Sequence, residues 1–200
     1  MSGVFVTGTD TDIGKTMVSA WLVRSWQADY WKPVQSGIND GCDADVIKRV
    51  APEARIHPSA FMLHAPLSPD QAAALDGVSI ALEDFHLPVA SGRPLVVEGA
   101  GGALVPLNDR HVMADLMARL GLPVVVVARS GLGTINHCLL TLEALQRRGI
   151  AVAGVVMNGP PNDANRQAIE HFSGVTVVGQ LPRLADLADL IAHPPLAWRP

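Results

Sequence analysis

The residues best suited to chemistry begin with a loop at positions 8–16, GTDTDIGKT. The loop follows a short apolar run at 4–7 and precedes a segment with helical spacing of apolar residues. In such a loop, backbone N–H groups and the helix N-terminus cradle phosphates. The lysine, here Lys15, reaches the β- and γ-phosphate oxygens, and the hydroxyl, here Thr16, ligates Mg²⁺. The sequence therefore predicts that a nucleoside triphosphate binds here together with Mg²⁺.

This loop departs from the usual phosphate-loop spacing, which has four residues between its glycines. Gly8 and Gly14 are separated by five residues, so the loop is one residue longer, or Thr9 takes the place of the first glycine. The structural alternative is a capped helix start with an incidental lysine. The order of strand, glycine loop, GKT and helix favours a phosphate loop. The spacing indicates a subclass of P-loop proteins.

Two further motifs stand at the ends of predicted strands. Glu98 follows Leu-Val-Val and precedes Gly-Ala-Gly-Gly, and an acid beside a phosphate loop can hold Mg²⁺ directly or through water. The alternative, a solvated acid in a turn, is less favoured because buried strand ends rarely carry an acid without a partner. Lys32 opens the segment 32–37, KPVQSG. It either stabilises a second anion or is an ordinary surface lysine, and the residues alone leave both open.

The elements that must position these motifs alternate along the chain. Short, nearly continuous apolar runs without period-2 alternation are typical of strands buried on both faces of a parallel sheet. Segments of helical length separate them, which is the βαβ pattern of a doubly wound α/β domain whose ligands bind at the carboxyl ends of the strands. We predict one such domain over residues 1–200, with a mostly parallel sheet flanked by helices, and only connecting structure with one helix in 52–92. The predicted strands are 4–7, 30–34, 94–97, 124–128, 152–157 and 175–178, and the predicted helices are 15–27, 43–50, 69–75, 111–120, 134–148 and 163–172.

Composition excludes several classes of protein. Of the 200 residues, 48% are hydrophobic and 17% charged, which suits a folded core and not a disordered chain. A formal net charge of −4 gives no electrostatic case for a nucleic-acid partner. No apolar run reaches the length of a membrane span, and the N-terminus lacks the basic region of a signal peptide. The isolated Cys42 and Cys138 favour a reduced, cytoplasmic protein.

Taken together, the motifs resemble dethiobiotin synthetases, the ATP-dependent carboxylases of biotin synthesis. The matching segments are VTGTDT at 6–11 with Gly14-Lys15-Thr16, KPVQSG at 32–37, VEGAGG at 97–102 and LGTINH at 132–137. The resemblance extends to about Pro182. It implies an enzyme that takes 7,8-diaminopelargonate, CO₂ and MgATP to dethiobiotin, ADP and phosphate, through an N-carbamate and a carbamic-phosphoric mixed anhydride. It also implies a homodimer with the substrate site at the subunit interface.

The resemblance assigns roles residue by residue. Lys15 and Lys32 become the cations of the catalytic site, with Thr11 and Ser36 as hydrogen-bond donors to substrate or phosphate. The Mg²⁺ ligands become Thr16, Glu98 and an aspartate that opens the helix after the second strand. Asp43 and Asp45 compete for that role, and the spacing to the following Arg-Val-Ala favours Asp43. The acid that does not bind Mg²⁺ would lie in the first helical turn, where its negative charge interacts favourably with the helix dipole.

The resemblance also implies where the rest of each ligand binds. Asn158 would recognise the nucleotide base, and the loop 132–137 would reach the substrate carboxylate of the partner subunit, although Thr134 and Asn136 are also ordinary helix-capping types. The nucleotide-binding residues would be Asp12, Ile13, Gly14, Lys15, Thr16, Met17, Glu98, Gly99, Ala100, Gly101, Asn158, Gly159, Leu181, Pro182 and Arg183. The substrate-binding residues would be Lys32, Ser36, Thr11, Gly101, Ser68, Gly133, Thr134 and Asn136.

Two rival classes share the P-loop. Nucleotide switches of the chromosome-partitioning kind place a lysine five residues before the lysine of GKT, where this chain has Asp10. They also have no need for a second lysine motif such as KPVQSG. Amidoligase-like P-loop enzymes usually carry a second, glutamine-hydrolysing domain, for which 200 residues leave no room. Both alternatives are therefore less favoured than the synthetase.

Overall fold

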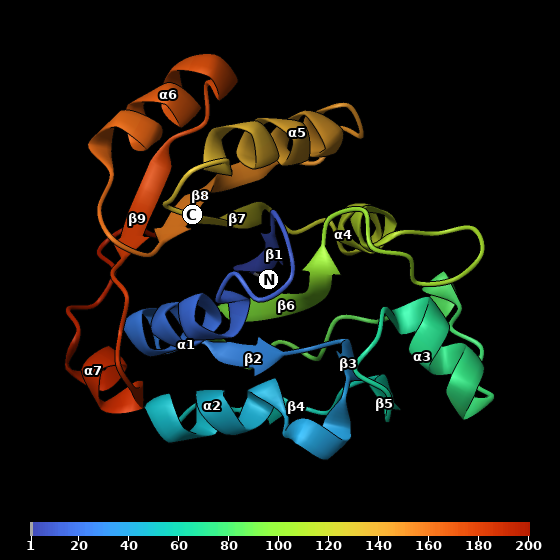
Figure 1. The fold of residues 1–200 in the computed structure, drawn as a ribbon. Coiled ribbons are helices and arrows are strands. Elements are labelled where there is room, and N and C mark those ends of the chain that lie inside the picture. Colours follow the sequence, from blue (N-terminus) through green and yellow to red (C-terminus); the bar gives the residue numbers. More distant parts are fainter. Residues whose placement is uncertain (1) are drawn as a thin grey trace.

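Seven parallel strands form the central sheet of the computed structural model, which describes residues 2–200. Their order across the sheet is β4-β2-β6-β1-β7-β8-β9, so the first strand lies in the middle with β6 and β7 beside it (Figure 1). The predicted doubly wound α/β fold is thereby confirmed. The strands are β1 Gly3–Gly8, β2 Asp29–Trp31, β4 Ile56–His57, β6 Leu95–Gly102, β7 Val124–Arg129, β8 Val152–Asn158 and β9 Val177–Leu181.

Helices cover both faces of this sheet, and each face has its own apolar core. Val4 and Val6 of β1 pack on the side of α1, α2 and α7, whereas Phe5 packs on the side of α4, α5 and α6. Because both faces are buried, alternate residues of a strand are equally apolar, which is why the strands show no period-2 alternation. The helices are α1 Lys15–Trp26, α2 Asp43–Val50, α4 Met113–Leu120, α5 Thr134–Gln146, α6 Asp163–Ser173 and α7 Leu187–Ala192.

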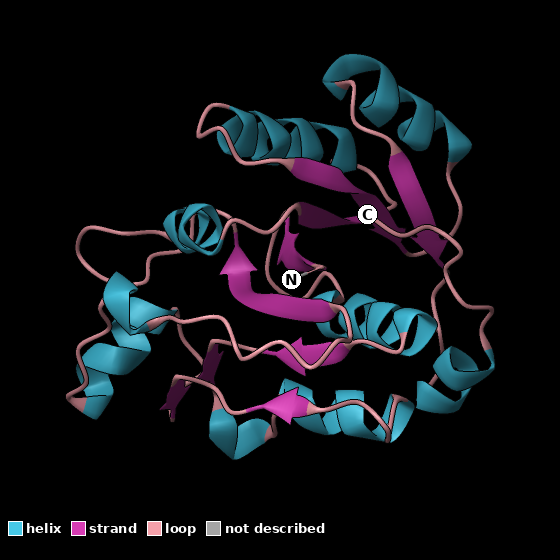
Figure 2. Ribbon diagram, turned by 180° about the vertical axis from the view of Figure 1, so that it is seen from behind, coloured by secondary structure: helices cyan, strands magenta, loops and turns pink. Residues whose placement is uncertain are grey.

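The second predicted strand, 30–34, is wrong as a continuous element. Strand β2 ends at Trp31, and β3 Val34–Ser36 leaves the central sheet to pair with β5 Phe61–Leu63 in a separate small sheet (Figure 2). Pro33 lies at the break, where its missing N–H cannot continue the hydrogen-bonded ladder. The break leaves Lys32 just beyond the carboxyl end of β2.

The stretch 52–92 contributes more than the connecting structure we predicted. It supplies β4 at the edge of the central sheet, β5 of the small sheet, α3 Pro69–Asp76 and a 3₁₀ helix, Leu82–Asp84; a second 3₁₀ helix spans Ile38–Asp40. The predicted helix 69–75 is confirmed as α3. Strands β4 and β5 have two and three residues, which is too short for a periodic pattern to reveal them.

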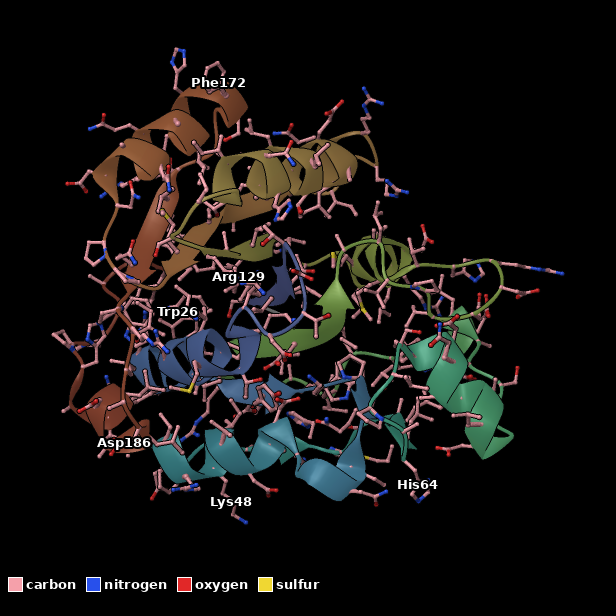
Figure 3. The ribbon with its side chains drawn as sticks, viewed as in Figure 1. Trp26, Lys48, His64, Arg129, Phe172 and Asp186 are labelled. Atoms are coloured by element: carbon pink, nitrogen blue, oxygen red, sulfur yellow. The ribbon has the colours of Figure 1, made fainter. Side chains whose placement is uncertain are left out.

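The C-terminal residues 193–200 pack along α1, whose N-terminus carries the phosphate loop. The indole N–H of Trp21 donates to the carbonyl of Pro194 at 2.9 Å, and that of Trp26 donates to the carbonyl of Trp198 at 2.9 Å. The rings of Trp26 and Trp198 lie 5.8 Å apart, and Figure 3 labels Trp26 beside α1. Buried indoles that satisfy their N–H groups in this way fix the outer face of α1.

The two thiols differ in accessibility, which predicts a labelling pattern. Cys138 of α5 is buried, and burial raises the pKa of its thiol to about 11, while Cys42 is partly exposed. Because the thiolate is the reactive form, we expect iodoacetamide at pH 8 to modify one thiol in the folded protein and both in denaturant. Mass spectrometry counts the adducts, with Cys42→Ser as the control that leaves the folded protein unmodified. Labelling of Cys138 in the folded protein would contradict this expectation.

Candidate active site

The phosphate loop joins the end of β1 to the start of α1 in the middle of the sheet. Gly14 lies directly before α1 with a φ of +88°, in the left-handed region that favours glycine. Lys15 is the first residue of the helix, and its ammonium donates to the backbone carbonyl of Asp10 at 3.2 Å. The lysine therefore folds back across its own loop, as a phosphate-binding lysine must.

Three oxygen-bearing side chains from three elements meet at the helix start. The hydroxyl of Thr16 donates to one carboxylate oxygen of Asp43 and lies 3.0 Å from Oε1 of Glu98. Glu98 is fully buried in β6, and Asp43 opens α2. Asp45 is exposed on α2, so the structure brings Asp43 and not Asp45 to Thr16.

Lys32 lies between the two carboxylates and is almost fully buried. Its ammonium is 2.6 Å from Oδ2 of Asp43 and 3.2 Å from Oε1 of Glu98. Burial alone would lower the pKa of Lys32, but the attraction of Glu98 and then Asp43 outweighs it and raises that pKa. Burial would likewise raise the pKa of Asp43, and the attraction of Lys32 lowers it instead. Lys32 is therefore a fixed cation and not a surface lysine.

Lys15 differs electrostatically from Lys32. Burial lowers its pKa, and the attraction of Glu98 only partly opposes that effect. Its ammonium has a carbonyl partner but no carboxylate within ion-pair distance among the described side chains, which leave out that of residue 40. A buried ammonium without a carboxylate partner is stabilised strongly by an anionic ligand. This property suits a lysine that binds phosphate.

Sequence reasoning missed two side chains that hold this cluster. The hydroxyl of Tyr30 is buried and donates to Oε2 of Glu98 at 3.0 Å, and burial followed by the charge of Glu98 raises its pKa well above the ordinary value. The side-chain oxygen of Gln35 accepts from the backbone N–H of Asp43 at 3.2 Å and so positions the start of α2. The available signal for Tyr30 was its place two residues before Lys32, because alternate strand residues share a face.

A cavity of about 890 Å³ opens over this cluster. The walls that face the phosphate loop come from the segment around Lys32 and from residues 66–69, which lie before and at the start of α3. The structure thus places most of the predicted catalytic, metal and substrate residues, with several of the predicted nucleotide-binding residues, around one space. Those residues are Thr11, Asp12, Gly14, Lys15, Thr16, Lys32, Ser36, Asp43, Ser68, Glu98, Ala100 and Gly101.

A second cavity of about 500 Å³ lies on the other side of the loop and shares Asp12 with the first. The side-chain amide of Asn158, at the end of β8, donates to the carbonyl of Ile13 at 2.8 Å and so joins this cavity to the phosphate loop. A space beside the loop, at the ends of late strands, is where a nucleotide base and ribose would extend. The predicted nucleotide residues here are Asp12, Ile13, Met17, Asn158, Gly159, Leu181, Pro182 and Arg183.

Four predicted site residues line neither cavity. Gly99 packs against Phe5 in the core, where an added Cβ would lie 2.8 Å from the ring. Gly133 and Asn136 are exposed at the start of α5, and Thr134 is buried with its hydroxyl donating to the carbonyl of Arg129 at 2.5 Å. That bond explains Thr134 as a residue that fixes the start of α5. Gly133 and Asn136 are exposed and make no contribution to either cavity of this chain.

Arg129 also contacts the phosphate loop, and the sequence did not reveal this contact. It ends β7, and its guanidinium donates to the carbonyl of Thr11 at 3.3 Å and lies 3.5 Å from the carboxylate of Asp10 (Figure 3). Its side chain is half exposed, so solvent screens this ion pair and its contribution to stability is small. Its effect is to hold the outer part of the phosphate loop against the end of β7.

The donor set at Thr16 fits a hard divalent cation. Among residues 2–200 no three His, Cys, Asp or Glu side chains gather as a metal site. Two carboxylates and one hydroxyl do converge, however, and Mg²⁺ typically takes one or two carboxylates with waters and substrate phosphates completing its shell. Thr16, Asp43 and Glu98 are therefore suitable ligands for the Mg²⁺ of a nucleotide complex.

A parallel sheet whose central strand leads through a glycine loop into a helix beginning Lys-Thr defines a P-loop nucleotide-binding protein. Solved structures share this fold: a ParA family ATPase from Chlorobium tepidum (TM-score 0.53, 13% identity, 96% of this chain and 90% of that chain) and a chain of the MinC:MinD cell division protein complex of Aquifex aeolicus (TM-score 0.59, 11% identity, 96% and 85%). A family model described as an AAA domain matches residues 2–190.

Closer relatives define the family. The ATP-dependent dethiobiotin synthetase BioD of Paramagnetospirillum magneticum is 62% identical over 92% of this chain and 89% of its own length, and that of Brucella ovis is 48% identical over 96% and 91%. The chain belongs to the family of ATP-dependent dethiobiotin synthetases and is thus an enzyme of the ligase class. A longer relative in Bordetella avium, 54% identical, is named a biotin biosynthesis bifunctional protein; 40% of its length matches this chain.

None of the helices in residues 2–200 combines the length and the apolar character needed to cross a bilayer.

Proposed function

We propose that the chain converts 7,8-diaminopelargonate, CO₂ and MgATP to dethiobiotin, ADP and phosphate. The observation that carries this proposal is Lys32, a second buried cation that faces the same cavity as Lys15. A protein that only binds and hydrolyses a nucleotide needs cations at the phosphates alone. A second fixed cation beyond the phosphate loop suits an anionic acceptor of the γ-phosphoryl group.

In this proposal, an amine of the substrate attacks CO₂ and loses a proton to form an N-carbamate. A carbamate oxygen then attacks the γ-phosphorus, the bond to the β-phosphate oxygen breaks, and ADP leaves. The second amine attacks the carbamic-phosphoric carbonyl and loses a proton, the C–O bond to phosphate breaks, and the ureido ring closes as phosphate leaves. Negative charge develops on carbamate and phosphoryl oxygens in each step, so fixed cations contribute more than a strong base.

The roles of individual residues follow from where they lie. Lys15 binds the β- and γ-phosphate oxygens, and Lys32 binds the carbamate and γ-phosphoryl oxygens. The hydroxyl of Ser36 is buried and has no hydrogen-bond partner among the side chains that the structure describes, which supports a role as donor to the substrate; Thr11 also lines this cavity. Gly101 and Ser68 complete the substrate side of the cavity.

Thr16, Asp43 and Glu98 hold the Mg²⁺ that accompanies the nucleotide in this proposal. That ion would neutralise charge on the phosphate oxygens during transfer. The nucleotide base would extend toward Asn158 in the second cavity, which Leu181, Pro182 and Arg183 also line.

We further propose that the enzyme acts as a cytoplasmic homodimer, with Gly133, Thr134 and Asn136 at the partner's substrate site. Leu132, at the tip of this loop, is a fully exposed apolar residue, which supports burial against a second copy. Analytical ultracentrifugation measures the assembly state. A monomer that turns over at the full rate would remove these three residues from the substrate site.

ADP release tests the proposed reaction. We expect it to depend on both diaminopelargonate and bicarbonate, with dethiobiotin formed in a 1:1 ratio to ADP as measured by mass spectrometry. The reaction class requires this ratio because one phosphoryl transfer activates each carbamate. ADP release at the same rate without the amine and bicarbonate would instead favour a nucleotide switch and would contradict the proposal.

A further inference from the structure

Each oxygen of the Glu98 carboxylate has a different set of partners. Oε1 lies 3.0 Å from the hydroxyl of Thr16 and 3.2 Å from the ammonium of Lys32, and thus faces the cavity. Oε2 points the other way and accepts from the hydroxyl of Tyr30 at 3.0 Å. Both Glu98 and Tyr30 are fully buried, so water does not compete for this second bond. The hydroxyl of Tyr30 therefore fixes how the carboxylate is turned.

Strand register brings Tyr30 to this position. Strands β2 and β6 are parallel neighbours, with Tyr30 opposite Val96 and Trp31 opposite Val97. Glu98 is two residues beyond Val96 and thus on the same face, and Lys32 is two residues beyond Tyr30. A tyrosine side chain is long enough to reach forward along the neighbouring strand. Strand β2 thus supplies the donor at Oε2, and the residue just beyond its end supplies the cation at Oε1.

We propose that Tyr30 is a positioning residue for the nucleotide-bound Mg²⁺, acting through Glu98. The terminal torsion of a glutamate has broad, roughly two-fold preferences, so the carboxylate needs a partner on each oxygen to stay in one orientation. A buried acceptor without a donor is costly, and it turns to find another partner. Without the Tyr30 hydroxyl, Oε2 would turn toward Lys32 or Thr16, and the oxygen offered to the cation would be misplaced.

This inference rests on the proposed function only in that MgATP binds at Thr16, Asp43 and Glu98. Tyr30→Phe keeps the ring that packs in the core and removes one hydroxyl. Because partners outside the metal shell typically contribute 10- to 100-fold to metal affinity or activity, we expect Tyr30→Phe to raise the Mg²⁺ concentration for half-maximal turnover by about tenfold. We expect the KM for diaminopelargonate to stay unchanged.

Binding measurements separate this role from a purely structural one. Calorimetric titration with a non-hydrolysable ATP analogue, with and without Mg²⁺, gives the gain in affinity that Mg²⁺ provides. Tyr30→Phe should reduce this gain about tenfold and leave binding of the metal-free analogue unchanged. The matched control is Ser91→Ala, which also deletes a hydroxyl that donates to a buried carboxylate, at 2.6 Å from Asp29 at the other end of β2. It should lower the melting temperature without changing the Mg²⁺ gain.

A second variant keeps the test independent of stability. In a Glu98→Gln background, Tyr30→Phe should cause no additional loss of the Mg²⁺ gain, because its effect passes through that carboxylate. An equal Mg²⁺ gain in Tyr30→Phe and the unmodified protein, or equal losses in Tyr30→Phe and Ser91→Ala, would overturn the inference. Failure of the unmodified protein to bind the Mg²⁺–analogue complex would instead contradict the proposed function.

Discussion

Lys32→Ala is expected to lower kcat by about 10²- to 10³-fold while changing the KM for ATP little. This is the loss that typically follows when an enzyme is deprived of one fixed hydrogen-bond donor to an oxygen that becomes negatively charged during the reaction. The ammonium is held by Asp43 and Glu98 at 2.6 and 3.2 Å, so it faces the cavity at a fixed point before substrate binds. Charge on the carbamate and phosphoryl oxygens develops along the reaction. The loss should therefore appear in kcat more than in ground-state binding. Steady-state kinetics at saturating MgATP measures both constants.

The control for Lys32→Ala is Lys48→Ala, which removes the same side chain from the exposed outer side of α2 (Figure 3). That variant should keep the unmodified kcat. Lys32→Ala also leaves two carboxylates facing each other, and loss of one partner from a buried ion pair typically costs about 3–5 kcal/mol of stability. A thermal melt with and without MgATP therefore accompanies the kinetics. An unchanged kcat in Lys32→Ala would exclude Lys32 from catalysis.

Local sequence patterns were enough to predict the longer strands of the sheet, six of its helices and the phosphate loop. Valine-rich runs such as β7 are long enough to identify a doubly buried strand, and each of the six predicted helices appears within two residues of its predicted ends. Strands β4 and β5 and the helix α7 could not be predicted in this way. These elements have two, three and six residues, which is too short for a periodic pattern, so their formation depends on tertiary contacts.

Contacts at the site are likewise of two kinds: those between sequence neighbours could be predicted, and those that depend on the tertiary structure could not. The residues of the loop are neighbours in sequence, so their spacing predicted the phosphate-binding arrangement. The bond between Tyr30 and Glu98 joins positions 68 residues apart and depends on the register of β2 against β6, which no single segment encodes. Asp43 and Asp45 are both acids in the first turn of α2. Only the direction of each side chain distinguishes them, and the structure turns Asp43 to Thr16 and exposes Asp45.

Gly14→Ala is expected to weaken ATP binding by at least about 100-fold, because two costs coincide at this position. Its φ of +88° lies in the left-handed region, which costs an alanine about 1–2 kcal/mol. An added Cβ would also lie 2.0 Å from the side-chain nitrogen of Asn158, far inside contact distance. Asn158 would have to give up its bond to the carbonyl of Ile13, which joins the second cavity to the phosphate loop. Calorimetric titration with an ATP analogue measures the loss.

Two comparisons separate backbone strain from the clash. Gly77 has a φ of +66° with nothing within 4 Å of an added Cβ, so Gly77→Ala carries the strain alone. It should cost about 1 kcal/mol of stability and leave ATP affinity unchanged. In an Asn158→Ala background the clash is absent, so Gly14→Ala should then weaken binding far less than it does in the unmodified protein. Equal losses in both backgrounds would show that loop strain, and not contact with Asn158, makes glycine necessary between the phosphate and base cavities.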